Sequence, residues 1–163
     1  MNRQEIETLL PHRERALLLD SAEVYPQENR AVGYLKATTE LCEGHFPEYP
    51  IVRGVDRVEM IILTLLLAAQ VFLKKDEVAV LLEFNKARFP SPAFPGDIIR
   101  SESTIAIRLN NVIKGSGKAY VGKKVVAQVE GIILVSVDKN LLEMGNGKIL
   151  DESEVGQGST LIQ

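Results

Sequence analysis

Residues 55–73 are the most apolar stretch of the chain, and apolar side chains would occupy almost the whole circumference of a helix formed by them. This pattern is typical of a helix that is buried on nearly every side. At ~1.5 Å per residue such a helix would be roughly 28 Å long, about the width of a small domain. The mostly apolar run Met60–Leu73 has 14 residues, whereas a bilayer core needs about 20. The pattern therefore predicts a buried helix and no membrane span.

Two later segments alternate apolar and polar side chains, which indicates strands with one buried face. They are residues 99–109 and residues 125–137. In the second segment, one side would carry Val125, Ala127, Val129, Ile133, Val135 and Val137. We interpret Gly115, Gly117 and Gly122 as turn residues between strands.

The first half of the chain adds smaller elements. Residues 2–10 have apolar side chains at helical spacing, and Pro11 ends this short helix. The extended runs 17–25 and 31–38 flank a segment with the composition of a turn and predict a hairpin, and residues 77–89 predict a further strand. One long buried helix and several antiparallel strands make an α+β fold in which a sheet wraps around the helix.

Composition and charge narrow the class of protein. A length of 163 residues with 45% apolar and 25% charged residues predicts one domain over residues 1–163, with a polar tail from about residue 140. The net charge of −3 argues against a nucleic-acid surface. Cys42 is the single cysteine and no signal sequence is evident, so we expect a cytoplasmic protein without disulfides. Cys42 has no Cys or His at metal-ligand spacing, and we expect no metal site.

Residues 40–54 are crowded with glycine, proline and polar residues, which favours an irregular loop. At the end of this loop, residues 44–59 read GHFPEYPIVRGVDRVE. This segment resembles the signature of the hotdog-fold 3-hydroxyacyl-[acyl-carrier-protein] dehydratases. In that signature Gly-His-Phe-Pro is followed by Pro, by Gly-Val, and by an acid fourteen residues after the histidine. His45 and Glu59 keep that spacing, while Arg53 stands where the family usually has proline.

Two more segments are similar to the same family. Residues 86–97 (KARFPSPAFPGD) resemble its strand and turn beyond the helix, and residues 10–13 (LPHR) fit its entry segment. The resemblance covers most of the chain and implies the hotdog fold, an antiparallel sheet wrapped around a long central helix. A lone loop histidine is more often structural than catalytic, and we interpret His12 of the entry segment in this way.

The reaction of this family explains why histidine and glutamate occur together. Converting a (3R)-3-hydroxyacyl thioester to a trans-2-enoyl thioester removes a C2 proton and expels a hydroxyl from C3, so it needs a base and an acid. His45 suits the base, because imidazole titrates near neutral pH. Glu59 would be the acid if burial keeps it protonated. The opposite assignment stays open, as does a core carboxylate paired with Arg53 or Arg57.

The thioester carbonyl also needs a hydrogen-bond donor, because negative charge develops on its oxygen when C2 loses its proton. Gly54 begins the long helix, so its backbone N–H is unpaired and lies at the positive end of the helix dipole. The absence of a side chain at Gly54 would also let the substrate approach the backbone. The resemblance implies the same role for this glycine and a substrate-binding role for Phe46, Val55 and Phe89. This chemistry needs no metal or other cofactor.

The resemblance also implies partners and an assembly. The substrate would be an acyl group on acyl carrier protein, or on coenzyme A, in fatty-acid synthesis. Chains of this family form homodimers in which each site takes histidine from one chain and the acid from the other, and such dimers commonly assemble further into a hexamer, a trimer of dimers. Two alternatives stay open: a hotdog thioesterase in which Glu59 activates water, and a non-catalytic acyl-binding protein with the same fold.

Overall fold

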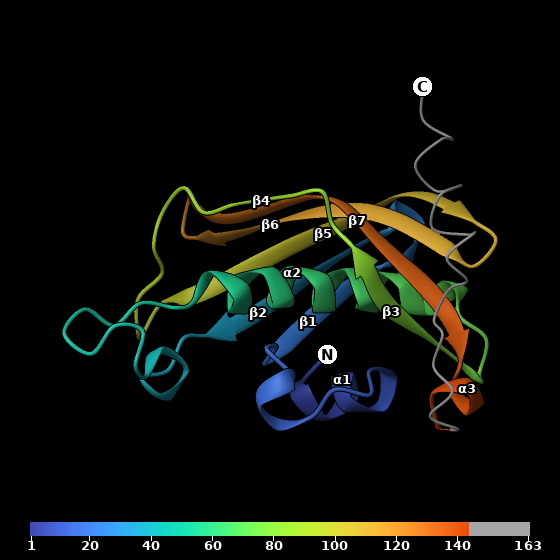
Figure 1. Cartoon of the computed structure of the whole chain (residues 1–163), viewed down its shortest axis with the longest axis horizontal. Helices are drawn as coiled ribbons and strands as arrows, with labels where there is room; N and C mark the ends of the chain where they lie inside the picture. Colours follow the sequence, from blue (N-terminus) through green and yellow to red (C-terminus); the bar gives the residue numbers. More distant parts are fainter. Residues whose placement is uncertain (144–163) are drawn as a thin grey trace.

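The computed structural model of the chain describes residues 1–143. The helices are α1 (Arg3–Leu9), α2 (Gly54–Ala69) and α3 (Lys139–Glu143), with 3₁₀ turns at residues 14–16, 26–28, 40–42 and 70–72. The strands are β1 (Ser21–Tyr25), β2 (Arg30–Lys36), β3 (Glu77–Glu83), β4 (Lys86–Arg88), β5 (Ile98–Leu109), β6 (Val112–Val121) and β7 (Lys124–Asp138). They form one antiparallel sheet in the order β1-β2-β5-β6-β7-β3, with β4 paired to β7. Figure 1 shows this sheet curling around α2, which confirms the predicted α+β architecture.

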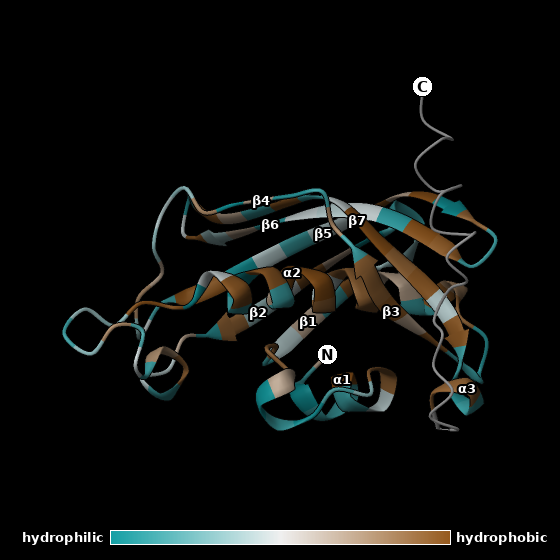
Figure 2. Cartoon of the chain, viewed as in Figure 1, coloured by the Kyte–Doolittle hydropathy of each residue, from teal (hydrophilic) through white to brown (hydrophobic). Residues whose placement is uncertain are grey.

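Helix α2 is the centre of the core. Every residue from Met60 to Ala69 is buried, and Figure 2 shows the apolar colour along this helix. The helix ends at Ala69 and continues as the 3₁₀ turn Gln70–Phe72, so it is slightly shorter than the apolar pattern predicts. Within residues 1–143, no helix combines the length and the apolar character needed to cross a membrane.

Gly115 and Gly117 lie inside strand β6, which corrects the interpretation that they are turn residues. Both face α2. A side chain at Gly115 would lie 2.8 Å from Cδ1 of Leu65, and one at Gly117 would lie 2.5 Å from Cγ2 of Ile61. Glycine therefore allows the sheet to approach a helix whose large side chains already fill the interior. Gly122 does lie in the turn between β6 and β7, as predicted.

Strand β7 changes its buried face part-way along its length. Val129 and Ile132 pair with two residues of β6 that are only two positions apart, so β7 contains one extra residue. The extra residue forms a β-bulge at Gly131, whose φ is 64°. Such a bulge inverts the alternation beyond it. Ile132 is therefore fully buried, and the predicted single apolar side of 125–137 is wrong at Ile133 and Val137, which are only partly buried. It is also wrong at Val125, because a second register shift against β6 places Val126 in the core instead.

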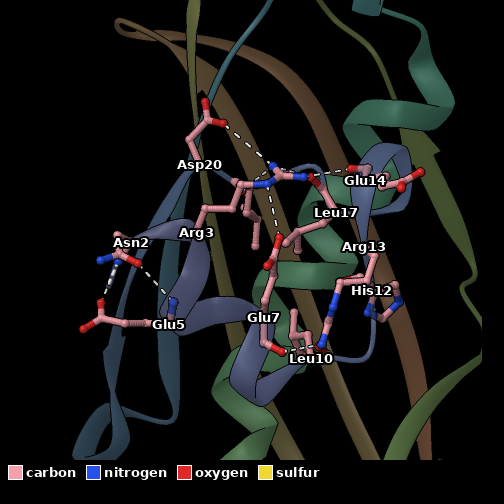
Figure 3. Close-up of polar contacts among 11 residues, drawn as sticks. Asn2, Arg3, Glu5, Glu7, Leu10, His12, Arg13, Glu14, Leu17 and Asp20 are labelled. Atoms are coloured by element: carbon pink, nitrogen blue, oxygen red, sulfur yellow. Dashed lines mark hydrogen bonds and ion pairs between the residues drawn. The ribbon is translucent and has the colours of Figure 1, made fainter.

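Helix α1 and the segment after it are anchored by Arg3. Figure 3 shows its guanidinium reaching across to that segment, where it donates to the carbonyls of Glu14 at 2.8 Å, Leu17 at 3.0 Å and Leu19 at 3.1 Å. The carbonyls of Leu17 and Leu19 bind this side chain instead of a neighbouring strand, which is why β1 begins at Ser21 and not at Leu17 as predicted.

Residues 77–89 form two strands where the sequence predicts one. Strand β3 pairs with the C-terminal part of β7, and β4 pairs with its middle part. At the end of the sheet, β3 has a strand neighbour on one side only within the described chain. Residues 144–163, which include most of the predicted polar tail, lie outside the described part. The single domain over residues 1–163 therefore stays a prediction.

Candidate active site

His45 lies in the loop between β2 and α2, which Figure 1 shows in cyan beyond the N-terminal end of α2. Its N–H donates to the Cys42 carbonyl at 3.0 Å, and its own carbonyl accepts from the Ile51 N–H at 2.9 Å. The side-chain Nδ1 lies 3.1 Å from the Ile51 carbonyl oxygen. Since a carbonyl oxygen only accepts, Nδ1 carries the proton in this contact and Nε2 keeps its lone pair. Nε2 has no hydrogen-bond partner among residues 1–143, so in the neutral ring it can accept a proton.

Gly54 is the first residue of α2, and its N–H has no hydrogen-bond partner in the described part of the chain. A side chain at Gly54 would lie 3.1 Å from the Phe89 ring. Glycine therefore leaves room for Phe89 to pack closely over the start of the helix, where the sequence suggests an approach by substrate. The guanidinium of Arg57 lies 5.1 Å from the centroid of the same ring. Phe89 is held by both residues and is still 45% exposed.

Two charged side chains are buried in the first turn of α2. Asp56 accepts two hydrogen bonds of 2.8 Å from Nε and Nη2 of Arg53, and only 8% of its side chain is exposed. Its negative charge lies where the positive end of the helix dipole favours it. Arg57 donates to the carbonyls of Ser91, at 2.8 Å, and Val126. These contacts fasten the start of α2 to the segment after β4 and to β7, and neither arginine pairs with Glu59.

Glu59 opens into a cavity of about 430 Å³ whose walls come from α2, β3, α3 and the loop after α1. The walls are mostly apolar, with Ile62, Leu66 and Val80 among them. The carboxyl of Glu59 has no hydrogen bond or ion pair with any of residues 1–143. Burial raises the pKa of this carboxyl above its ordinary value, and the nearby charge of Asp56 adds to the effect. Glu59 therefore keeps its proton to a higher pH than an exposed glutamate does, as a proton donor requires.

The raised pKa of Glu59 predicts a pH-dependent gain in stability for Glu59→Gln. The parent is most stable below the unfolded pKa of about 4.3, because there the buried carboxyl is protonated in both states. It loses that stability as pH rises through the higher folded pKa. In melts followed by circular dichroism, the variant should unfold about 2–4 °C above the parent at pH 8 and at the same temperature near pH 4. An equal gain at both pH values would contradict this cause.

One chain does not bring His45 and Glu59 together. Glu59 faces β3, whereas the His45 loop lies beyond the N-terminal end of α2, and His45 is not among the residues around the Glu59 cavity. Phe46 and Val55, which the sequence predicts to bind substrate, also lie outside this cavity and are 54% and 67% exposed. Phe46 stacks on His45 with 4.4 Å between ring centroids. Each half of the predicted pair is formed, but the halves are separate.

Comparison with known proteins identifies the family. The chain is 34% identical over 128 residues to the FabZ 3-hydroxyacyl-[acyl-carrier-protein] dehydratase of Koribacter versatilis (strain Ellin345). The aligned region covers 76% of this chain and 82% of the relative. It is also 34% identical over 133 residues to the FabZ dehydratase of Clostridioides difficile (strain 630), covering 80% and 94%. The chain belongs to the 3-hydroxyacyl-[acyl-carrier-protein] dehydratase family. No family model matches it.

Solved structures agree with the fold of this dehydratase-family chain. An uncharacterized protein from Pyrococcus horikoshii is similar with a TM-score of 0.63 and 20% identity, covering 77% of this chain and 88% of that one. The fluoroacetyl-CoA thioesterase FlK is similar with a TM-score of 0.64 and 10% identity, covering 72% and 91%. At these identities the likeness concerns the fold alone, and it confirms the predicted hotdog fold.

Sequence reasoning misses two polar residues of this dehydratase-family site. It predicts a structural role for His12, whereas the structure places His12 in the wall of the Glu59 cavity. It leaves Arg57 as one possible partner of Glu59, whereas Arg57 holds backbone carbonyls and Phe89. The signal for Arg57 is its place in the first turn of a helix that is otherwise buried. His12 belongs to the entry segment that resembles the family, but its place in the cavity wall depends on how the loop folds back.

Proposed function

We propose that this chain dehydrates 3-hydroxyacyl thioesters to 2-enoyl thioesters and catalyses the reverse hydration. The observation that carries the proposal is the Glu59 carboxyl, which opens into a mostly apolar cavity without a partner in the described chain. An unpaired acid in such a place is costly for the fold and is typical of a group that acts on a ligand. The relatives in Koribacter and Clostridioides are named for this reaction.

Three groups would each carry out one part of the reaction. Nε2 of His45 removes the C2 proton, and the electrons of that C–H bond move toward the thioester. The N–H of Gly54, at the positive end of the α2 dipole, donates to the thioester oxygen while negative charge develops there. The protonated carboxyl of Glu59 gives its proton to the C3 hydroxyl, which leaves as water when the C2=C3 bond forms. Proton return from His45 to Glu59 through solvent completes the turnover.

We further propose a homodimer in which the partner's loop supplies histidine to each Glu59 cavity. Strand β3 has a free edge in the described chain and forms one wall of that cavity. Leu81 is 37% exposed and Phe84 is 40% exposed. Apolar side chains beside an open strand edge are typical of a surface that another chain covers. Pairing about a two-fold axis would create two equal sites, and three such dimers would make a hexamer.

We propose that the substrate is carried on acyl carrier protein, as the names of the relatives state for those proteins, and that the enzyme works in the cytoplasm. The test offers crotonyl and longer 2-enoyl thioesters on carrier protein and on coenzyme A and follows the absorbance of the conjugated double bond. We expect the absorbance to fall without release of free thiol. Release of thiol at a comparable rate would indicate a thioesterase. Bound acyl chains without any absorbance change would indicate a non-catalytic binding protein.

A further inference from the structure

His12 has a buried nitrogen that no described residue satisfies. Its Nδ1 is closed to solvent and has no hydrogen-bond partner among residues 1–143. The other ring nitrogen, Nε2, has no partner there either, but it is not closed to solvent. The ring lines the same cavity as Glu59. The imidazole, with one ring nitrogen still accessible, and the candidate acid therefore line one cavity.

The loop that carries His12 is fastened on both sides of it. Nη1 of Arg13 donates to the carbonyls of Leu10 and of His12 itself, both at 2.7 Å, and Nη2 donates to the Glu7 carbonyl at 2.8 Å. Figure 3 shows the Arg13 side chain turned back toward the end of α1, with the His12 ring beside it. Pro11 fixes the backbone just before His12. A fixed loop of this kind is what a ligand-binding side chain requires.

The protonation state of His12 suits contact with a neutral ligand group. Burial, with the charge of Arg13 adding to it, lowers the pKa of His12 below its ordinary value and so favours the neutral ring. A neutral imidazole has one nitrogen that donates and one that accepts. A hydroxyl group or a water molecule also donates and accepts, and can therefore pair with the accessible Nε2 in either tautomer of the ring.

The rest of the cavity wall in the described chain leaves few other partners for such a group. Apart from His12 and Glu59, the only polar side chain in it is that of Lys139. Nζ of Lys139 donates to the carbonyl of Lys75 at 2.8 Å. A hydroxyl brought to Glu59 thus meets an otherwise apolar surface, and burying it there without a second hydrogen bond would be costly.

We infer that Nε2 of His12 binds the 3-hydroxyl of the substrate, and the water that this hydroxyl becomes, beside Glu59. His12 recognises the hydroxyl, whereas Glu59 transfers a proton to it. The inference rests on the proposed dehydratase function and adds a specificity-determining residue to the same site.

Three substitutions separate this role from a purely structural one. In His12→Gln the side-chain amide reaches about as far as Nε2, in His12→Asn it reaches only about as far as Nδ1, and His12→Leu fills the space without hydrogen bonding. Calorimetry would compare two unreactive thioester mimics, the 3-hydroxybutyryl and butyryl amides of pantetheine, so that the ratio of their affinities isolates the hydroxyl. Relative to the parent and His12→Gln, this ratio should fall about three- to tenfold in His12→Leu and His12→Asn, the size of one hydrogen bond.

An unchanged ratio in His12→Leu would overturn the inference. A ratio restored by His12→Asn but not by His12→Gln would also overturn it, because the role would then belong to Nδ1. The activity of the parent protein distinguishes a failure of this inference from a failure of the proposed function. A parent that does not hydrate crotonyl thioesters refutes the function, whereas an active parent whose hydroxyl preference does not depend on His12 refutes only the role of His12.

Discussion

The variants His45→Ala and Glu59→Gln should each hydrate an enoyl thioester about 10²–10⁴ times more slowly than the parent, the factor that a positioned acid or base contributes. Alanine removes the free Nε2 of His45. Glutamine keeps the size and polarity of Glu59 but cannot transfer its proton. Both variants should remain folded, because His45 lies in a loop and the Glu59 carboxyl has no partner in the described chain. Initial rates with crotonyl thioester and circular dichroism spectra measure the two effects.

The matched control is Glu48→Gln, which neutralises an exposed carboxylate in the same loop as His45. It should keep the parental rate, because an exposed side chain of this kind has no part in the proposed site. A rate near that of the parent for His45→Ala or for Glu59→Gln would contradict the assigned chemistry. An unfolded variant would be recognised by its spectrum and replaced by His45→Gln or Glu59→Ala.

A mixture of the two inactive variants should recover activity. If each site takes histidine from one chain and glutamate from the other, a dimer of one His45→Ala chain and one Glu59→Gln chain has one intact site and one doubly altered site. Random pairing after unfolding and joint refolding makes half of the dimers mixed, so the expected activity is about a quarter of the parental value. The measurement is the hydration rate of the refolded equimolar mixture.

Each variant refolded alone serves as the control and should stay inactive. A mixture that also stays inactive, although mass spectrometry under native conditions detects mixed dimers, would contradict a site shared between chains. In that outcome His45 and Glu59 would have to act within one chain, which would require the loop 43–53 to leave the position that the structure gives it.

The fold was predictable from sequence where a pattern depends on one element alone. The apolar circumference of α2 and the alternation in β5 needed no knowledge of their neighbours. The sequence could not reveal that Gly115 and Gly117 belong to a strand, because glycine is also the usual turn residue. The reason for these glycines lies in the large side chains of Leu65 and Ile61 on another element. The bulge at Gly131 was hidden for the same reason, since it is defined by pairing with β6.

The candidate site likewise has features that the sequence predicts and features that depend on distant parts of the chain. The spacing of His45 and Glu59 could be read directly, because it belongs to one continuous motif of the family. The cavity of Glu59 could not, because β3, α3 and the loop around His12 come from distant parts of the sequence. The separation of His45 from Glu59 within one chain follows from where the loop after β2 lies. Only the resemblance to the dehydratase family, which implies a site shared between two chains, predicts this separation from the sequence.

The ion pair of Arg53 and Asp56 makes these two positions depend on each other unequally. Replacing Arg53 alone would leave the carboxylate of Asp56 buried and unpaired, which is strongly unfavourable. Losing Asp56 alone would leave Arg53, whose side chain is 53% exposed, partly in contact with water. The stability of the fold therefore depends more on the arginine of this pair than on the aspartate.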